Sequence, residues 1–281
     1  MKKKIRKAGP PGWAVTLVWL AVIVAIWEIA AASVEGNLRT PENTMPHIWQ
    51  IIGSIFDPSP VSSRMSAVQI VLQSARDTLV RAGIGFLLGS GIGFLLALVM
   101  KLSGIVEKIL FPYLMLIQMI PILGMAPIIL SITGDIGVSR IIIAAILTFY
   151  PVATNTLAGL NSVSLEKNEL MYSYAATKRN LYGKVLIPSA IPFFFTGLKI
   201  AAPMAITASI LVDTLQGDGG LGCMLSQSLR HAMSIYVFWQ IVLLAAIVGI
   251  LSSYLMGLIE NGVSPIKRVE RKLKKEAEAN D

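Results

Sequence analysis

The chain has 281 residues and a net charge of +8 at pH 7; 54% of its residues are hydrophobic and only 14% are charged. Soluble domains carry about 25% charged residues, so this composition predicts an integral membrane protein with about six spans. The basic residues flank apolar segments, so the positive charge does not predict nucleic-acid binding. Cys223 is the single cysteine, which excludes an internal disulfide framework, and His47 and His231 have no companions at metal-ligand spacing. No metal or bound cofactor is expected.

Six apolar segments approach the ~20 residues that cross a bilayer as a helix. They are Trp13–Ala32, Thr78–Met100, Ile105–Ile129, Val138–Leu160, Ile191–Asp213 and Tyr236–Leu258. Lysine and arginine concentrate before the first segment, in the fourth-to-fifth loop and after the last, which predicts that both termini are cytoplasmic. The expected fold class is all-α and multi-pass. A cleaved signal peptide fits the start less well, because the first apolar run is too long for one.

These spans divide the chain into four parts. A basic cytoplasmic N-tail (1–12) precedes a part that holds the first span and an outer amphipathic segment (13–77). The core (78–260) contains the cytoplasmic loop 161–189, and a charged cytoplasmic tail (261–281) follows it. We see no second domain in the outer segment.

Two spans carry residues that shape helix packing. Gly85, Gly89 and Gly93 recur every four residues, so they lie on one helix face and allow another helix to approach closely. Packing inside the chain is favoured over self-association. The third segment contains three prolines, which remove backbone donors and bend helices. It is expected to bend around a cavity or to be a kinked structural helix; the prolines are Pro112, Pro121 and Pro127.

Polar residues also occur in or beside the apolar segments. His47–Ile55 and Met65–Leu72 are amphipathic and are expected to lie along the outer surface. Glu28 and Asp213 lie near the outer ends of their spans, where a carboxylate is either functional or reaches the interface. The long stem of Lys199 would let its ammonium reach the inner face.

The chain has no nucleotide-binding motif. Its single Gly-Lys pair, Gly183-Lys184, lacks the first glycine of a phosphate-binding loop and is followed by valine. The glycine-rich stretch GDGGLG (217–222) follows a span on the outer side, where a turn is the ordinary explanation. We therefore expect a chain that is not an enzyme and does not bind ATP itself.

The longest polar interruption between apolar regions runs from Glu169 to Pro192. It carries Lys178 and Arg179 among helix-forming residues and ends in a paired-proline block. A positively charged helical segment between two spans predicts a docking surface for a soluble cytoplasmic partner.

This loop resembles the EAA signature of ATP-binding-cassette (ABC) importer permeases, in which Glu-Ala-Ala is followed by a glycine and ends at Leu-Pro or Ile-Pro. Anchoring on Ile187-Pro188 places the glutamate on Glu169 and the glycine on Ala175, while Leu170 and Met171 replace the two alanines. The likeness extends over residues 72–258 and includes IQMIPILGMAPIIL, TFYPVATNTLAGLNSV, PSAIPFFFTGLKIA and GDGGLG. The ordered set resembles type I permeases that import nitrate, sulfonates, taurine and pyrimidine or flavin vitamin precursors.

The resemblance implies a homodimeric permease in the cell (inner or plasma) membrane, with cytoplasmic ATPase subunits below and an external solute-binding protein above. ATP would be bound by the partner. The coupling helix would sit in a groove of the ATPase, with close approach at its small residues. Its coupling residues would be Glu169, Tyr174, Ala175, Ala176, Lys178, Arg179, Gly183 and Pro188.

The fifth span bears on the solute. Sulfonate and nitrate members often show Gly-x-Ala-Trp there, whereas this chain reads APMAITASILVD, which favours a vitamin precursor over these anions. Thr207, Ser209 and Asp213 are candidates for lining the path. An ion-coupled secondary transporter, the transmembrane scaffold of a vitamin-uptake complex and a passive channel remain as alternatives; the first usually shows central ionisable groups and repeat symmetry.

Overall fold

A computed structural model describes residues 12–37, 44–62, 64–216, 219–230 and 234–264. Nearly all of the two predicted basic tails, together with His231 and the first two residues of the GDGGLG stretch, lie outside these residues.

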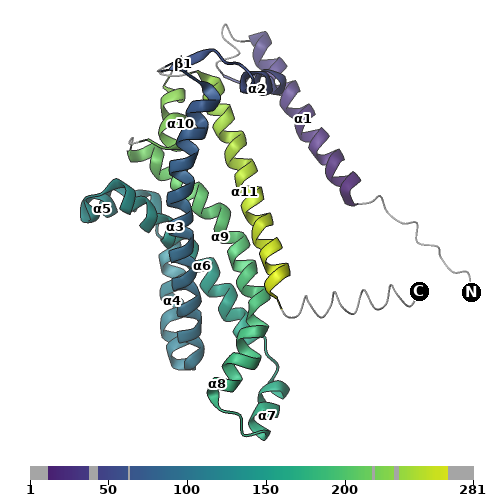
Figure 1. Cartoon of the computed structure of the whole chain (residues 1–281), viewed down its shortest axis with the longest axis vertical. Helices are drawn as coiled ribbons and strands as arrows, with labels where there is room; N and C mark the ends of the chain where they lie inside the picture. Colours follow the sequence, from purple (N-terminus) through teal and green to yellow (C-terminus); the bar gives the residue numbers. More distant parts are fainter. Residues whose placement is uncertain (1–11, 38–43, 63, 217–218, 231–233, 265–281) are drawn as a thin grey trace, which may run out of the picture.

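The described chain is almost entirely helical, as predicted (Figure 1). Its elements in order are α1 (Gly12–Asn37), α2 (Ile48–Ile55), β1 (Pro60–Ser62), β2 (Met65–Ser66), α3 (Ala67–Leu102), α4 (Gly104–Met119), α5 (Ile122–Thr133), α6 (Ile136–Asn161), α7 (Leu165–Ser173), α8 (Lys178–Leu181), a π-helical turn (Tyr182–Leu186), α9 (Ile187–Gln216), α10 (Leu221–Leu229) and α11 (Ile235–Val263). Within the described residues, five helices are long and apolar enough to cross a membrane, or six if the bent pair α4–α5 counts as one span. This agrees with the expected number.

The core of the bundle is formed by α3, α6 and α9, which pack along their lengths (Figure 1). The glycines of α3 make this contact possible. A Cβ atom built on Gly85 would lie 2.5 Å from the Cβ of Ala144, and one on Gly93 would lie 2.5 Å from the carbonyl oxygen of Phe149, both on α6. The predicted internal packing role of these glycines is confirmed.

The third predicted span is broken. α4 and α5 meet at an angle of 106°, with Ile120 and Pro121 between them, and α5 projects sideways from the bundle (Figure 1). Proline cannot donate to the preceding turn, so the backbone leaves the helix at Pro121. The predicted bend is confirmed, and it divides the segment into two helices rather than kinking one.

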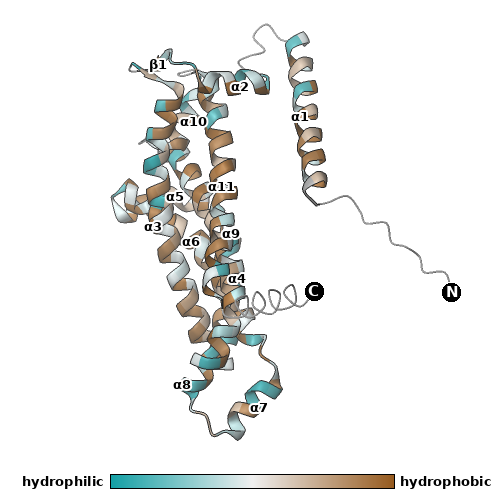
Figure 2. Ribbon diagram, turned by 45° about the vertical axis from the view of Figure 1, so that its right-hand side comes forward, coloured by the Kyte–Doolittle hydropathy of each residue, from teal (hydrophilic) through white to brown (hydrophobic). Residues whose placement is uncertain are grey.

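One of the two amphipathic stretches expected along the outer surface forms a helix there. α2 lies across the end of the bundle that also carries α10, with Ile51 buried and Trp49 and Ile52 exposed (Figure 2). Met65–Leu72 is not a surface helix: it includes the short strand β2 and the start of α3, which Ser66 caps by accepting from the Gln69 N–H.

Helix α1 stands apart from the bundle and is fastened at its outer end (Figure 1). Glu28 accepts from the ring Nδ1 of His47 at 2.5 Å and from the backbone N–H of Ile48 at 2.9 Å. Trp27 donates to the carbonyl of Pro46 and packs edge-on against Trp239 of α11, with ring centroids 4.7 Å apart. Glu28 therefore attaches α1 to the start of α2.

Candidate functional site

The predicted docking loop projects beyond the inner end of the bundle as α7, a turn and α8 (Figure 1). Figure 2 shows hydrophilic residues on both short helices. Neither α7 nor α8 has a buried residue. We call residues 165–186 the coupling arm. It is held at its two ends by α6 and α9 and leaves most of its side chains open to a partner.

Helix α7 ends in a Schellman turn at Ala175. The N–H of Ala175 donates to the carbonyl of Tyr172, and the N–H of Ala176 donates to that of Met171, the pattern that places a left-handed residue just after a helix. Ala175 has φ +49°, in the region where glycine is strongly favoured. The position that the resemblance assigns to the motif glycine thus has a backbone conformation that favours glycine.

This turn corrects one expectation. Tyr174, Ala175 and Ala176 do not lie on the coupling helix, because α7 ends at Ser173. Glu169 lies on α7, and its carbonyl accepts from the hydroxyl of Ser173. Tyr174 is 77% exposed, so the turn presents its ring to the solvent side.

Helix α8 begins with two basic residues. Thr177 caps it by accepting from the N–H of Asn180 at 3.4 Å, and Lys178 and Arg179 follow in the first turn. Cations at a helix N-terminus oppose the helix dipole, so their position does not serve the stability of α8. Both side chains are exposed and available to an acidic partner.

The arm joins α9 through the π-helical turn. The N–H of Ile187 donates to the carbonyl of Tyr182, five residues back, and the next residue, Pro188, has no N–H to donate. The wide turn thus continues the helix across the proline, so α8 and α9 form one continuous helical segment. Gly183 is exposed, and a Cβ atom there would meet nothing within 4 Å. The structure brings Gly183 and Pro188 to the hinge of the arm, away from its tip.

The three path candidates do not share a face of α9. Thr207 is exposed and bonds only to its own helix in the hydrogen bonds of the described residues, donating to the carbonyl of Pro203. Ser209 and Asp213 are fully buried. Ser209 donates to the carbonyl of Thr78 at 3.3 Å, which joins α9 to α3.

Asp213 lies in a buried polar cluster at the outer end of the bundle. Its Oδ1 is 2.8 Å from Nε of Arg140, and its Oδ2 accepts from the hydroxyl of Thr78 at 2.7 Å. The same hydroxyl accepts from the N–H of Leu221, the first residue of α10. Gly220 has φ +86°, and a Cβ atom on it would clash with the Asp213 carboxylate. The cluster thus holds the start of α10. In the described part of GDGGLG, Gly219 and Gly220 form the expected turn, and Leu221 and Gly222 begin α10.

Sequence reasoning missed Arg140 and Thr78 as partners of Asp213. Arg140 lies inside the fourth apolar segment, Val138–Leu160. A charged residue in that setting usually pairs with another charge or with backbone carbonyls, and this signal predicts a partner for Arg140.

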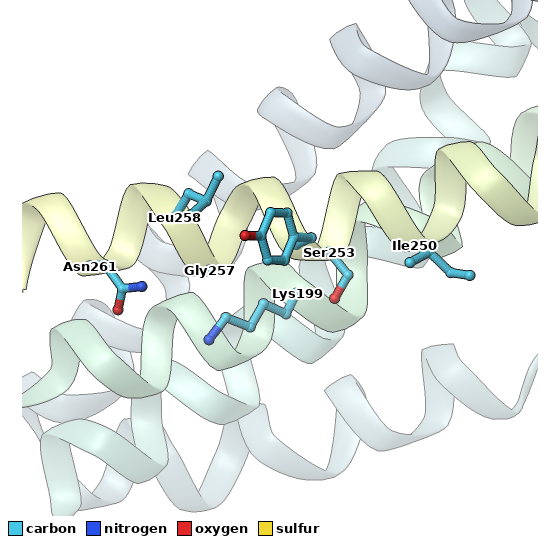
Figure 3. Close-up of a pocket in the computed structure, with 7 residues that line it drawn as sticks. Lys199, Ile250, Ser253, Gly257, Leu258 and Asn261 are labelled. Carbon is cyan, nitrogen blue, oxygen red and sulfur yellow. The ribbon is translucent and has the colours of Figure 1, made fainter. Parts of the chain in front are cut away.

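Lys199 lies in an open groove of about 530 Å³ between α9 and α11 (Figure 3). Its ammonium pairs with the buried carboxylate of Glu260 on α11. The expectation that Lys199 simply reaches the inner interface overlooked this partner. Polar groups also line the groove, which is formed by Lys199, Ile250, Ser253, Tyr254, Gly257, Leu258 and Asn261.

Comparisons with known proteins agree with this architecture. Residues 89–265 match the family described as "Binding-protein-dependent transport system inner membrane component". The chain is 30% identical to the formylaminopyrimidine transport permease protein ThiX of Halalkalibacterium halodurans over 257 residues, which is 90% of this chain and 95% of that protein. It is 29% identical to the nitrate import permease protein NrtB of Synechococcus elongatus, over 73% of each chain. It is 25% identical to the putative aliphatic sulfonates transport permease protein SsuC of Bacillus subtilis, over 89% of this chain and 86% of that one.

Solved structures show the same fold. The MetNI methionine ABC transporter in an inward-facing conformation matches with a TM-score of 0.62 at 18% identity, covering 70% of this chain and 97% of that chain. An amino acid ABC transporter matches with a TM-score of 0.59 at 21% identity, covering 70% and 95%. The chain is a multi-pass membrane protein with a type I importer fold, and it belongs to the family of binding-protein-dependent inner-membrane components, as an ABC importer permease of the nitrate, sulfonate and pyrimidine branch.

Proposed function

We propose that the chain is the transmembrane subunit of an ATP-driven importer and that its coupling arm docks a cytoplasmic ATPase. The observation that carries this proposal is the arm itself: it extends from the inner end of the bundle, has no fully buried residue in α7 or α8, and continues directly into α9. A segment whose side chains stay mostly exposed in its own fold is suited to burying them against a partner. Membership of the family implies an ATPase and an external binding protein.

The residues of the arm take distinct roles in this proposal. Ala175 sets the turn that separates α7 from α8, while Tyr174 and Ala176 beside it form an apolar contact with the ATPase. Lys178 and Arg179 pair with acidic groups of the ATPase, which favours association and fixes its orientation. Glu169 lies on α7, whose last residue is Ser173, and Gly183 and Pro188 form the hinge to α9.

The full assembly in this proposal is a homodimer of the chain with two ATPase subunits and one binding protein. Both termini are cytoplasmic: α1 runs toward the end that carries α2, and α11 runs back toward the end that carries the arm (Figure 1). ATP-driven closure of the ATPases moves the two arms as rigid bodies and switches access to the path.

The solute in this proposal is a pyrimidine-type vitamin precursor, with nitrate and sulfonates as the competing class. The formylaminopyrimidine permease is similar over nearly its full length, and the fifth span lacks the tryptophan block of anion importers. Of the three path candidates, Thr207 is the one exposed on α9, so we assign it to the path. Ser209 and Asp213 instead hold the outer loop.

Substitutions at Ala175 test the docking role of the arm. Ala175→Trp should lower the amount of ATPase that co-purifies with the chain, because a β-carbon with a bulky ring is strained at φ +49° and distorts the turn. Ala175→Gly should keep or raise it, since glycine adopts this conformation freely. Ile105→Trp, at an exposed site on α4, is the size-matched control. Normal co-purification and uptake in Ala175→Trp would show that the arm is not the docking element.

Transport assays test the energy source and the solute. Proteoliposomes that contain the complex should take up labelled formylaminopyrimidine when ATP is supplied on the side of the membrane that the ATPase faces. They should take up nitrate or an alkanesulfonate much less. Uptake by the chain alone, driven by an ion gradient and indifferent to ATP, would support a secondary transporter instead.

A further inference from the structure

Four polar residues connect the inner ends of four helices at the root of the coupling arm. The hydroxyl of Tyr182 donates to the backbone carbonyl of Lys101 at 3.0 Å. The ammonium of Lys101 donates to Oδ1 of Asn161 at 2.6 Å, and the amide nitrogen of Asn161 donates to Oε1 of Glu107 at 3.1 Å. We call Lys101, Glu107, Asn161 and Tyr182 the inner strap.

Each member of the strap lies at the end of a different helix. Lys101 is in the last turn of α3, Glu107 is in the first turn of α4, Asn161 is the last residue of α6, and Tyr182 begins the π-helical turn that leads into α9. The last carbonyls of a helix have no partner within it, so the Tyr182 hydroxyl satisfies one that α3 leaves open. Ser103 is the single residue between α3 and α4, so the two helices are connected by a tight turn.

Tyr182 is also where the arm enters the packed bundle. Among the described residues, its hydroxyl makes the arm's one side-chain hydrogen bond to another helix. Its ring and Leu181 pack against the apolar cluster that contains Met100, Leu160 and Leu186, all nearly inaccessible to solvent. The residues of α8 before Leu181 (178–180) are exposed. The boundary between the open arm and the rigid bundle therefore falls at Leu181 and Tyr182.

We propose that Tyr182 positions the arm on the bundle and that the inner strap passes movement of the arm to α3, α4 and α6 together, rather than to α9 alone. This inference rests on the proposed function, because it needs an ATPase that displaces the arm. The π-helical turn explains why a second connection is needed. A widened turn that contains Gly183 is a less rigid link between the arm and α9, so it transmits movement of the arm less well. A bond that crosses from Tyr182 to α3 bypasses that link.

The strap is suited to transmission rather than to holding the fold together. Its Lys101–Asn161 and Asn161–Glu107 bonds are exposed to solvent, and the Tyr182 bond is half-buried. Such bonds add little net stability because water competes for the same groups. Removing one should leave insertion and packing intact while changing which helices follow the arm.

The test uses the complete complex of chain, ATPase and binding protein in inside-out membrane vesicles. Cys223→Ser removes the native thiol, and single cysteines are introduced by Asn180→Cys on the arm or Lys108→Cys at the start of α4, both exposed positions. The measured quantity is the rate of modification by a charged maleimide, with and without ATP plus vanadate. With the strap intact, trapping the ATPase should change the rate at both positions.

Tyr182→Phe keeps the ring in the apolar cluster and removes only the hydroxyl. We expect the effect of ATP plus vanadate on the modification rate to persist at position 180 and to fall about fivefold at position 108. A fivefold effect corresponds to ~1 kcal/mol, the net contribution of one hydrogen bond. Asn161→Leu should have the same effect at 108, and the double variant should lose no more than either single variant, because both cut one path. Tyr113→Phe, with an exposed ring on α4, is the matched control and should respond as the unaltered complex does.

Three results would overturn the proposal. These are an unchanged response at position 108 in Tyr182→Phe, no response at 108 with the strap intact, or loss of the ATPase from purified Tyr182→Phe, which would make Tyr182 a docking residue. Suppose that one of these results is found while the modification rate at position 180 responds to ATP plus vanadate and Ala175→Trp loses the ATPase. Then only the transmitting role of the inner strap is wrong. If instead Ala175→Trp retains the ATPase and the rate at position 180 does not respond, the docking role of the coupling arm is wrong as well.

Discussion

Arg140 and Asp213 form a fully buried ion pair between α6 and α9, with Nε of Arg140 2.8 Å from Oδ1 of Asp213 and both side chains at 0% exposure. Thr78 adds α3 to this contact and bonds the first N–H of α10. Three core helices and the helix beyond the glycine turn thus meet at one carboxylate. A buried charge pair adds little net stability over an apolar pair of similar size, but losing one partner is costly.

Arg140→Met should therefore release α10. It leaves the Asp213 carboxylate buried without its countercharge, at a cost of about 3–5 kcal/mol. Cys223 lies on α10 and is only 4% exposed, so its modification by a maleimide reports the opening of this helix. We expect the rate in detergent to rise about a hundredfold or more.

The control and the rescue make this measurement specific. Arg76→Met removes an exposed arginine from α3 and should leave the Cys223 rate unchanged. Arg140→Met combined with Asp213→Leu removes both charges and should restore most of the protection. Equal Cys223 rates in Arg140→Met and the unaltered chain would refute the clamping role.

A second pair predicts a stability effect at the inner end. Lys199→Met leaves the carboxylate of Glu260, whose side chain is 4% exposed, without its ammonium partner. The groove at Lys199 is open, so water can reach part of the site and the cost should be less than for Arg140, about 1–3 kcal/mol. Thermal unfolding of purified protein should show a lower midpoint for Lys199→Met and recovery when Glu260→Gln is added. A double variant as unstable as Lys199→Met would show that the pair itself does not matter.

The attachment of α1 to α2 should depend on pH through His47. Its hydrogen bond to Glu28, and a weaker one to Glu35, raise the pKa of His47 above the usual value near 6.5. A raised pKa means that this contact stabilises the fold fully below the unfolded pKa and loses that effect as pH rises through the folded value. We expect the thermal midpoint of the unaltered chain to fall toward that of His47→Gln over this range.

Below the unfolded pKa of His47, the two midpoints should differ by a constant amount. Glu35→Gln removes only the longer contact, at 3.3 Å, and should reduce the pH effect without abolishing it. Parallel curves for the unaltered chain and His47→Gln across pH 5–9 would contradict this assignment.

The periodic and local features of the sequence predicted most of the fold, and the non-local ones were missed. Apolar length located the spans, and glycine spacing located the face of α3 that meets α6, because both are properties of a single helix. Proline content predicted the bend of the third segment but not its 106° angle, which depends on how the neighbouring helices pack. The start of α3 at Ala67 was missed because its polar first turns were assigned to the outer segment.

The candidate sites follow the same division. The position of Ala175 in the motif was predictable, but its left-handed backbone was not, since that depends on where α7 stops. Asp213 was noted as an intramembrane carboxylate, whereas its partner Arg140 is 73 positions away in the numbering. A charge inside an apolar segment indicates that it has a partner but not which distant residue supplies it, so the pairing of Lys199 with Glu260 was missed as well.

The contact between α3 and α6 gives the last prediction, through two glycines that differ only in what faces them. A Cβ atom on Gly89 would clash with the hydroxyl of Thr148 and would lie 2.5 Å from the carbonyl of Ala145, whereas one on Gly91 would meet nothing within 4 Å. Gly89→Ala should force the helices apart at a cost of about 1–3 kcal/mol, the usual price of overpacking.

Gly91→Ala makes the identical chemical change two residues away and should be neutral or slightly stabilising, because alanine is the better helix former. Thermal unfolding midpoints of the two purified variants compare them directly. Retained stability in Gly89→Ala would mean that α6 can move away from α3 without loss. Equal destabilisation by both variants would instead show that the flexibility of the glycine backbone, and not close packing, is what α3 requires.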